Sequence, residues 1–128
     1  MAIEIGLKNR KEVIVTEELT AYASDHSLPA VFATPQLVSL MELTCADSLK
    51  PFLKEEEGSV GVTVNITHSG ATPIGQKIYC ESELVEISGK RSNKLLFKVN
   101  AYDESGLVGS GTHGRAIINM KAFIESLK

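Results

Sequence analysis

The spacing of apolar residues changes once along this chain, near residue 58, and this change constrains the fold more than any other feature. Before it, apolar residues recur every three or four positions, as on one face of a helix. After it, apolar residues alternate with small or polar ones, as in a half-buried strand. The sequence therefore predicts one long helix followed by strands. The residues at helical spacing are Leu37, Leu40, Met41, Cys45, Ser48, Leu49, Phe52 and Leu53.

The long helix is expected to begin at Thr34 and to run to about Leu53. Thr34 suits the N-cap position, and Pro35 then takes the first helical position, where its missing N–H costs nothing. Gly58, after a charged stretch, is expected to close the helix. A short strand at 11–15 and a short helix from 16 to about 25 are predicted ahead of it.

Four long strands are predicted after the helix. In the first, Val60 to His68, Val60, Val62, Val64 and Ile66 share one face if no bulge intervenes. The others are expected at 78–87, 95–102 and 107–119, with a terminal helix over 120–128. Tight turns between strands predict an antiparallel meander. A long central helix wrapped by a mostly antiparallel sheet is an α+β domain of the hotdog type.

Size and composition narrow the class of protein. The 128 residues suit one domain, 1–128, and a net charge of −3 argues against nucleic-acid binding. No apolar run approaches 18 residues and the N-terminus lacks a signal-peptide pattern, so we expect a cytoplasmic protein that does not bind membranes. Cys45 and Cys80 lie among apolar neighbours and are expected to be reduced and buried.

Two further patterns are interpreted as not functional. Residues 109–114 match the dinucleotide-binding pattern GxGxxG, but a strand follows and only 14 residues remain, too few for a βαβ unit. These glycines are expected to mark a bulge or a close approach of a ligand or second chain. His26, His68 and His113 have no metal-ligand spacing, so we expect no metal site.

Glu42 and His68 are the candidate catalytic residues. Glu42 lies on the helical wheel close to Leu49 and Leu53, where an unpaired carboxylate would cost several kcal/mol. The alternative is that it reaches the edge of the apolar stripe and meets water or a lysine. His68 ends its strand on the inward face, where it can act as a general acid or base, or be a structural histidine.

Thr34 is a third candidate. Its structural role as N-cap suffices to explain it, but a helix N-terminus also offers N–H groups and a positive dipole end. Such a place can bind a thioester oxygen and stabilise an oxyanion.

The chain resembles the fluoroacetyl-CoA thioesterase family of hotdog proteins. The resemblance rests on Val-Phe-Ala-Thr-Pro at 31–35, on Glu42, and on Thr-His-Ser-Gly-Ala-Thr-Pro-Ile-Gly at 67–75. The family's catalytic Thr, Glu and His match Thr34, Glu42 and His68 at the same intervals, and Gly61 matches a glycine of its acyl pocket. The segment Gly-Thr-His-Gly-Arg at 111–115 is also similar.

The resemblance implies an acyl-CoA thioesterase that works as a homodimer with its sites at the subunit interface. Glu42 would be a general base or a nucleophile, Thr34 would orient the attack or be the nucleophile, and His68 would transfer protons. Phe32 is the only aromatic residue just ahead of the helix, where the family carries an aromatic lid residue, and Arg115 would contact the CoA side. Coenzyme A is part of the substrate, and no other cofactor is implied.

An alternative from another class is a non-catalytic hotdog protein that binds acyl-CoA or a small acid, because a fold does not fix an activity. The sequence does not assign the acyl group.

Overall fold

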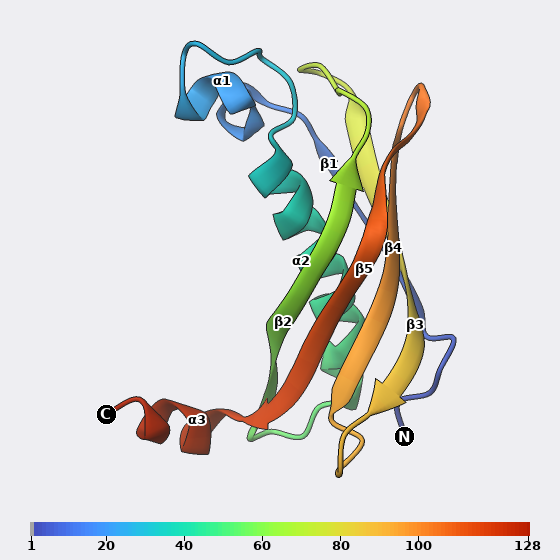
Figure 1. The fold of residues 1–128 in the computed structure, drawn as a ribbon, viewed down its shortest axis with the longest axis vertical. Helices are drawn as coiled ribbons and strands as arrows, with labels where there is room; N and C mark the ends of the chain where they lie inside the picture. Colours follow the sequence, from blue (N-terminus) through green and yellow to red (C-terminus); the bar gives the residue numbers. More distant parts are fainter. Residues whose placement is uncertain (1) are drawn as a thin grey trace.

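The computed structural model describes residues 2–128 and consists of one long helix packed on a five-stranded antiparallel sheet (Figure 1). The hotdog fold predicted from the sequence is confirmed. The predicted strand positions agree with the observed ones to within about three residues. The elements in chain order are β1 (Lys8–Ile14), η1 (Glu17–Leu19), α1 (Ala21–Ser24), α2 (Thr34–Leu49), η2 (Lys50–Phe52), β2 (Glu57–His68), β3 (Lys77–Ser88), β4 (Lys94–Asp103), β5 (Gly106–Asn119) and α3 (Met120–Ser126).

The strand order is β1-β3-β4-β5-β2, and every neighbouring pair is antiparallel. The predicted four-strand meander is therefore correct only for β3, β4 and β5. β2 pairs with β5 instead of β3, and so it lies at one edge of the sheet. Segment 69–76 carries the chain from that edge to β3, and its start is held by hydrogen bonds from Ser69 and Gly70 N–H to the Val108 carbonyl.

Helix α2 begins and ends differently from the prediction. Ala33 is the N-cap, Thr34 is the first helical residue and Pro35 the second, and no side chain caps the helix. The α-helix stops at Leu49 and continues as one 3₁₀ turn, because Pro51 has no N–H to donate to the carbonyl four residues earlier. The Thr34 hydroxyl is therefore not used as a cap.

A bulge in β2 overturns the predicted inward face. The pairing with β5 shifts between Gly61 and Thr63, so Gly61 pairs with Arg115 and Val64 with His113. Directly paired residues point to the same side of a sheet, so Gly61 and Val64 share one face even though their numbers differ in parity. Val60 and Val64 therefore point to opposite faces, and Val62 is 64% exposed. Ile66 and His68 keep the predicted parity with Val64.

The core lies between α2 and the sheet. Leu37, Met41 and Leu49 of α2 pack with side chains from β3 and β4 such as Leu84 and Phe97, all fully or almost fully buried. Cys45 and Cys80 are buried free thiols, and burial raises their pKa to about 12 and about 11. No helix within residues 2–128 is long and apolar enough to cross a membrane.

The glycines at 109–114 lie inside β5 and serve close packing. A Cβ on Gly109 would lie 2.9 Å from Cδ2 of Leu37, and one on Gly111 would lie 2.6 Å from Cα of Ile66. The absence of a side chain lets β5 approach both α2 and β2. The GxGxxG match is thus part of a strand, not a dinucleotide-binding turn.

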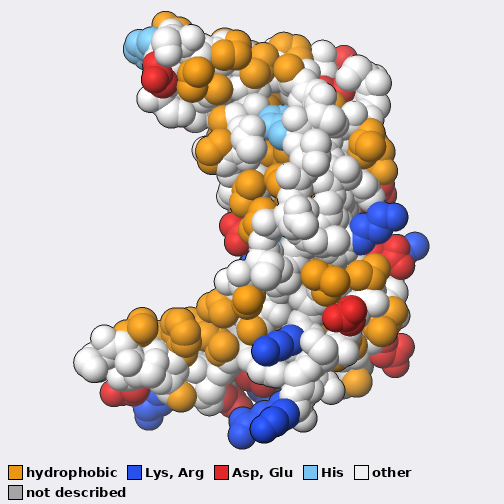
Figure 2. Space-filling view, viewed as in Figure 1, with side chains coloured by type: hydrophobic (Ala, Val, Ile, Leu, Met, Phe, Trp, Pro, Cys, Tyr) orange, Lys and Arg blue, Asp and Glu red, His pale blue; other side chains and the backbone are white. Residues whose placement is uncertain are grey.

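The two edges of the sheet differ in character. β1 has the sequence KNRKEVI, with ion pairs from Glu12 to Lys77 and from Lys11 to Asp47. β2 exposes Val62 and Val64, and Figure 2 shows the molecule hollowed on that side, between the α1 end and the projecting helix α3.

Candidate active site

Thr34 and His68 come together at the N-terminus of α2. His68 is the last residue of β2 and Thr34 the first of α2, and Thr34 Oγ1 lies 2.7 Å from His68 Nδ1. Because Ala33 rather than Thr34 caps the helix, the hydroxyl is available for this bond. Burial lowers the pKa of His68 below its ordinary value, so the ring is neutral at neutral pH and one ring nitrogen can accept a proton.

The second ring nitrogen of His68 points into the structure without a partner. His68 Nε2 is buried and has no hydrogen bond within residues 2–128. The pair borders a surface pocket of about 280 Å³, also lined by Val31, Phe32 and residues 69–71. A hydroxyl, a neutral imidazole and a helix N-terminus thus meet at one opening. The predicted residue Phe32 lines this pocket but is itself only 2% exposed.

Glu42 lies two helical turns away, in a separate cluster. It is eight residues after Thr34, which corresponds to about 12 Å along the helix axis. Its side chain is 39% exposed, so it lies at the border of the apolar stripe rather than inside it. Its charged neighbour is not a lysine but Arg115, with Oε2 3.9 Å from Nη1.

Gly61 leaves the space that Glu42 occupies. A Cβ at position 61 would lie 2.6 Å from Glu42 Oε2 and 3.3 Å from His113 Cε1. The bulge in β2 turns this glycine toward the helix. Gly61, Glu42 and Arg115 are therefore brought together, whereas Glu42 is not brought to Thr34 and His68 within one chain.

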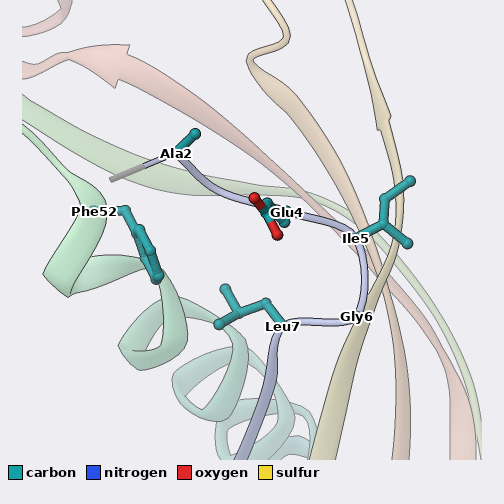
Figure 3. A pocket seen from close by; sticks show the side chains of 6 residues that line it. All are labelled: Ala2, Glu4, Ile5, Gly6, Leu7 and Phe52. Atoms are coloured by element: carbon teal, nitrogen blue, oxygen red, sulfur yellow. The ribbon is translucent and has the colours of Figure 1, made fainter.

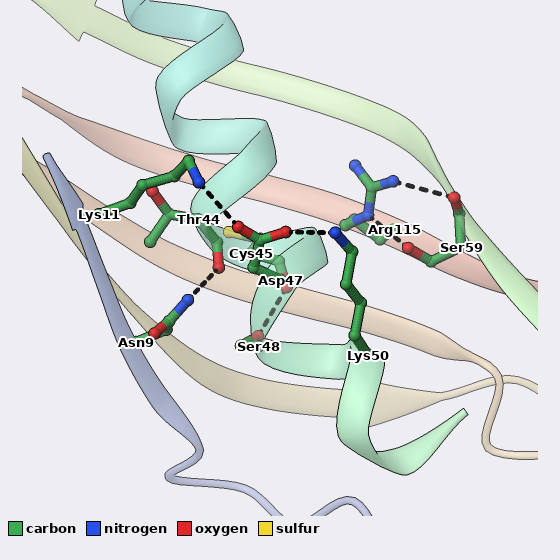
Figure 4. Close-up of polar contacts among 9 residues, drawn as sticks. All are labelled: Asn9, Lys11, Thr44, Cys45, Asp47, Ser48, Lys50, Ser59 and Arg115. Atoms are coloured by element: carbon green, nitrogen blue, oxygen red, sulfur yellow. Dashed lines mark hydrogen bonds and ion pairs between the residues drawn. The ribbon is translucent and has the colours of Figure 1, made fainter. Parts of the chain in front are cut away.

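Arg115 is buried, and its guanidinium N–H groups contact neighbouring acceptors that fix its orientation. Nε donates to Ser59 Oγ at 2.9 Å and Nη2 to the Ser59 carbonyl at 3.0 Å (Figure 4). Nη1 lies 3.1 Å from His113 Nε2. Burial also lowers the pKa of the Arg115 guanidinium from its ordinary value. The predicted contact of Arg115 with CoA stays a prediction.

The arginine fixes the tautomer of His113. A guanidinium only donates, so His113 Nε2 accepts, and Nδ1 carries the proton that it donates to the Thr63 carbonyl at 2.8 Å. Burial lowers the pKa of His113, in agreement with a neutral ring. The 4.0 Å approach of His113 Nε2 to Glu42 is therefore not an ion pair.

Sequence reasoning did not assign His113 or Ser59 to the site. For His113, the sequence pattern that could have indicated it is its spacing of two residues from Arg115, which places both side chains on one face of β5. No sequence pattern indicates Ser59, because its contact with Arg115 depends on the bulge in β2.

A larger cavity of about 580 Å³ lies elsewhere, between the N-terminal segment and Phe52 (Figure 3). It is lined by residues 2 and 4–7, and Glu4 is its single ionisable side chain among the lining residues. None of the predicted site residues borders it. Within residues 2–128 no group of three His, Cys, Asp or Glu side chains is close enough to hold a metal ion.

Comparison with known proteins identifies the family. The model of the fluoroacetyl-CoA-specific thioesterases matches residues 15–121, most of the chain. The chain belongs to this family.

Individual relatives agree with this assignment. A fluoroacetyl-CoA thioesterase of Streptantibioticus cattleyicolor is 41% identical over 95 residues, which span 74% of this chain and 66% of that protein. A solved structure of the fluoroacetyl-CoA thioesterase FlK superposes with a TM-score of 0.91 at 32% identity, covering 99% of this chain and 96% of the other. A thioesterase superfamily member of Thermus thermophilus has a TM-score of 0.88 at 29% identity over 98% and 90% of the two chains.

Proposed function

We propose that this member of the family is an acyl-CoA thioesterase that works as a homodimer. The observation that carries the proposal is the 2.7 Å contact between Thr34 Oγ1 and His68 Nδ1 at the N-terminus of α2. Relatives support the substrate class, since a variant of the thioesterase FlK, 32% identical to this chain, was solved with fluoroacetate and CoA.

In the proposed mechanism Thr34 is the nucleophile and His68 its base. Thr34 Oγ1 attacks the thioester carbonyl carbon while its proton passes to neutral His68 Nδ1. The tetrahedral oxyanion forms beside the first turn of α2, where the helix dipole favours negative charge. The C–S bond then breaks, and the proton on His68 passes to the departing CoA sulfur. Water hydrolyses the resulting acyl-threonine ester, and free acid leaves.

Dimerisation accounts for Glu42, which is too far from Thr34 to act within one chain. If two copies pair antiparallel along the free edge of β2, the Glu57 half of one strand, which contains Gly61, lies opposite the His68 half of the other. The partner subunit's Glu42 and Arg115 then approach Thr34 and His68. In this arrangement Glu42 is the general base that activates the deacylating water, and Arg115 lies beside its carboxylate.

Gly61 and Phe32 are proposed to shape the acyl site. Gly61 leaves the space beside Glu42 that a side chain would fill. Phe32 supports the pocket wall next to Thr34 from the core. In the proposed site both residues border the acyl group.

The test is release of free thiol from a panel of fluoroacetyl, acetyl, branched and aromatic CoA esters. Wild type is compared with Thr34→Val, which keeps the shape but removes the hydroxyl, and with Thr34→Ser, which keeps the hydroxyl. His68→Ala and Glu42→Gln complete the set. We expect a fall of about 100-fold or more in kcat for Thr34→Val and His68→Ala and a much smaller change for Thr34→Ser.

Three results would contradict the proposal. Full activity of Thr34→Val would exclude the threonine as nucleophile. Accumulation of an acyl-enzyme in Glu42→Gln, seen by mass spectrometry, supports the role in deacylation, and its absence in an inactive variant would refute that role. If no ester turns over in wild type while CoA esters raise its Tm, the protein binds acyl-CoA without hydrolysing it.

A further inference from the structure

Helix α3 presents an apolar face that its own chain does not cover. Met120, Phe123, Ile124 and Leu127 recur at helical spacing and are 40%, 41%, 49% and 71% exposed. A helix of seven residues is not stable in water by itself, so its apolar face needs a partner surface.

The start of α3 is nevertheless fixed. Met120 N–H donates to the Glu56 carbonyl at 2.9 Å, and Asn119 Oδ1 accepts from Ala122 N–H at 2.9 Å as N-cap. The Met120 side chain packs on Gly58, where a Cβ would lie 2.6 Å from its sulfur. The direction in which α3 leaves the sheet is thus set by the first residues of β2.

That direction is toward the free edge of β2. In Figure 1 α3 continues from the lower end of β5, next to the start of β2, and the α1 segment overhangs the upper end of β2 on the same side; Figure 2 shows both projections. The exposed Val62 and Val64 lie between them. An edge strand with unpaired backbone groups, flanked by two apolar projections, is complementary to a second copy of itself.

The two-fold symmetry of such a pair determines what α3 would cover. Antiparallel pairing brings the Glu57 end of one β2 to the His68 end of the other. α3 leaves from the Glu57 end, so it reaches the partner's His68 end. The surface there is apolar, with Leu28 45% and Ile74 47% exposed and Val31 lining the 280 Å³ pocket.

We propose that the apolar face of α3 packs on a second copy of the chain, against its 28–34 segment, and forms a wall of that copy's Thr34–His68 pocket. The proposal rests on the homodimer of the proposed function and adds that each site takes a wall from the other chain. Phe123 and Ile124 then line the acyl-CoA entrance rather than the core of their own chain.

Disulfide trapping tests this placement. Phe123→Cys is combined with Val31→Cys in one chain and oxidised mildly, and Glu125→Cys with Val31→Cys is the matched control, because Glu125 lies on the opposite face of α3. A disulfide requires the two Cα atoms within about 7 Å. We expect a covalent dimer from the first pair and monomer from the control. Wild type gives the background, since Cys45 and Cys80 are buried.

A second readout is kinetic. Phe123→Ser with Ile124→Ser is expected to raise KM for the best acyl-CoA by about tenfold, equivalent to about 1.4 kcal/mol of binding, with a smaller effect on kcat. Glu125→Ser is expected to leave KM unchanged.

The outcomes separate this proposal from the proposed function. An intact dimer without the cross-link, a link within one chain, or a link between two Phe123→Cys positions overturns the placement of α3 and leaves thioesterase activity untouched. A protein that forms the cross-link but hydrolyses no acyl-CoA keeps the placement and refutes the activity. A strict monomer at micromolar concentration refutes both the placement and the dimer.

Discussion

Gly61 is the residue on which the Glu42 cluster depends most directly. In Gly61→Ala the new methyl carbon would lie 2.6 Å from Glu42 Oε2, so the carboxylate must move. A displacement of about 1 Å at a reacting group can cost about 100-fold in rate, and we expect a loss of about 10- to 100-fold in kcat/KM. The control is Thr67→Ala, an exposed position on the other face of β2. Normal activity of Gly61→Ala would show that the space beside Glu42 is not needed.

The histidines predict how activity depends on pH. Burial lowers the pKa of His68, and the proposed base must be neutral to accept the Thr34 proton. The rate should therefore be constant above the ordinary histidine pKa of about 6.5 and should fall only at more acid pH. A kcat profile from pH 5 to 8 measures this. A rate that rises steeply between pH 7 and 8 would exclude His68 as a neutral base of this kind.

Stability should fall in acid for the same physical reason. His68 and His113 have lowered pKa values when folded, so below about pH 6.5 the unfolded chain binds more protons than the folded one. The free energy of unfolding therefore decreases as pH falls from about 6.5 through the folded pKa values. His113→Gln should reduce this pH dependence in urea titrations at pH 5 to 8. His26→Gln, which changes an exposed histidine, is the control, and an equal reduction there would refute the assignment to buried rings.

For individual residues, the sequence identifies which side chains belong to the candidate site better than it identifies the side chains they contact. Thr34 and His68 were candidates for separate reasons, and their contact could not be derived, because it requires the return of β2 to the start of α2. Thr34 was expected to cap the helix, whereas its hydroxyl bonds to His68. His113 and Ser59 were missed because a pairing register decides their neighbours.

Among the elements, β5 is held by the closeness of its backbone to β2. A Cβ on Gly111 would meet the Asn65 carbonyl oxygen and lie 2.6 Å from Cα of Ile66, and neither is a side chain that can turn away. We expect Gly111→Ala to lower the free energy of unfolding by about 3 kcal/mol, measured by chemical denaturation. Ser110→Ala in the same strand is the control. A loss below about 0.5 kcal/mol would mean that the two strands separate easily.

Periodicity predicted the elements well because each buries one face along most of its length. It failed where a local event changes the period. The bulge between Gly61 and Thr63 reverses the face of the residues before it. Gly61 is compatible with a bulge, but a glycine within a strand does not by itself locate one. Pro51 indicates where α2 ends. The prediction nevertheless extends the helix to Leu53, because Phe52 and Leu53 continue the helical spacing of apolar residues. The neighbour of β2 was also mistaken, since adjacency in sequence favours β3.

For the whole molecule, the exposed edge strand predicts the oligomeric state. Val62 is 64% and Val64 47% exposed on β2. We expect wild type to be a dimer at micromolar concentration and Val62→Lys to raise the dimer Kd by more than about tenfold, or about 1.4 kcal/mol. Val85→Lys, on β3, is the matched control because Val85 is 39% exposed away from that edge. Light scattering measures both, and an unchanged dimer in Val62→Lys would exclude β2 as the contact.

The difference between the β1 and β2 edges of the sheet affects how many chains could join edge to edge. Two copies joined along β2 would leave one β1 at each outer end, and its KNRKEVI sequence surrounds the unpaired backbone with fixed charges. Adding a third chain there would bury lysine and arginine side chains against their like, which is how natural sheets prevent edge-to-edge polymerisation. A pair joined along β2 would thus expose only its two charged β1 edges, so its association would stop at two chains and would not continue into a fibre.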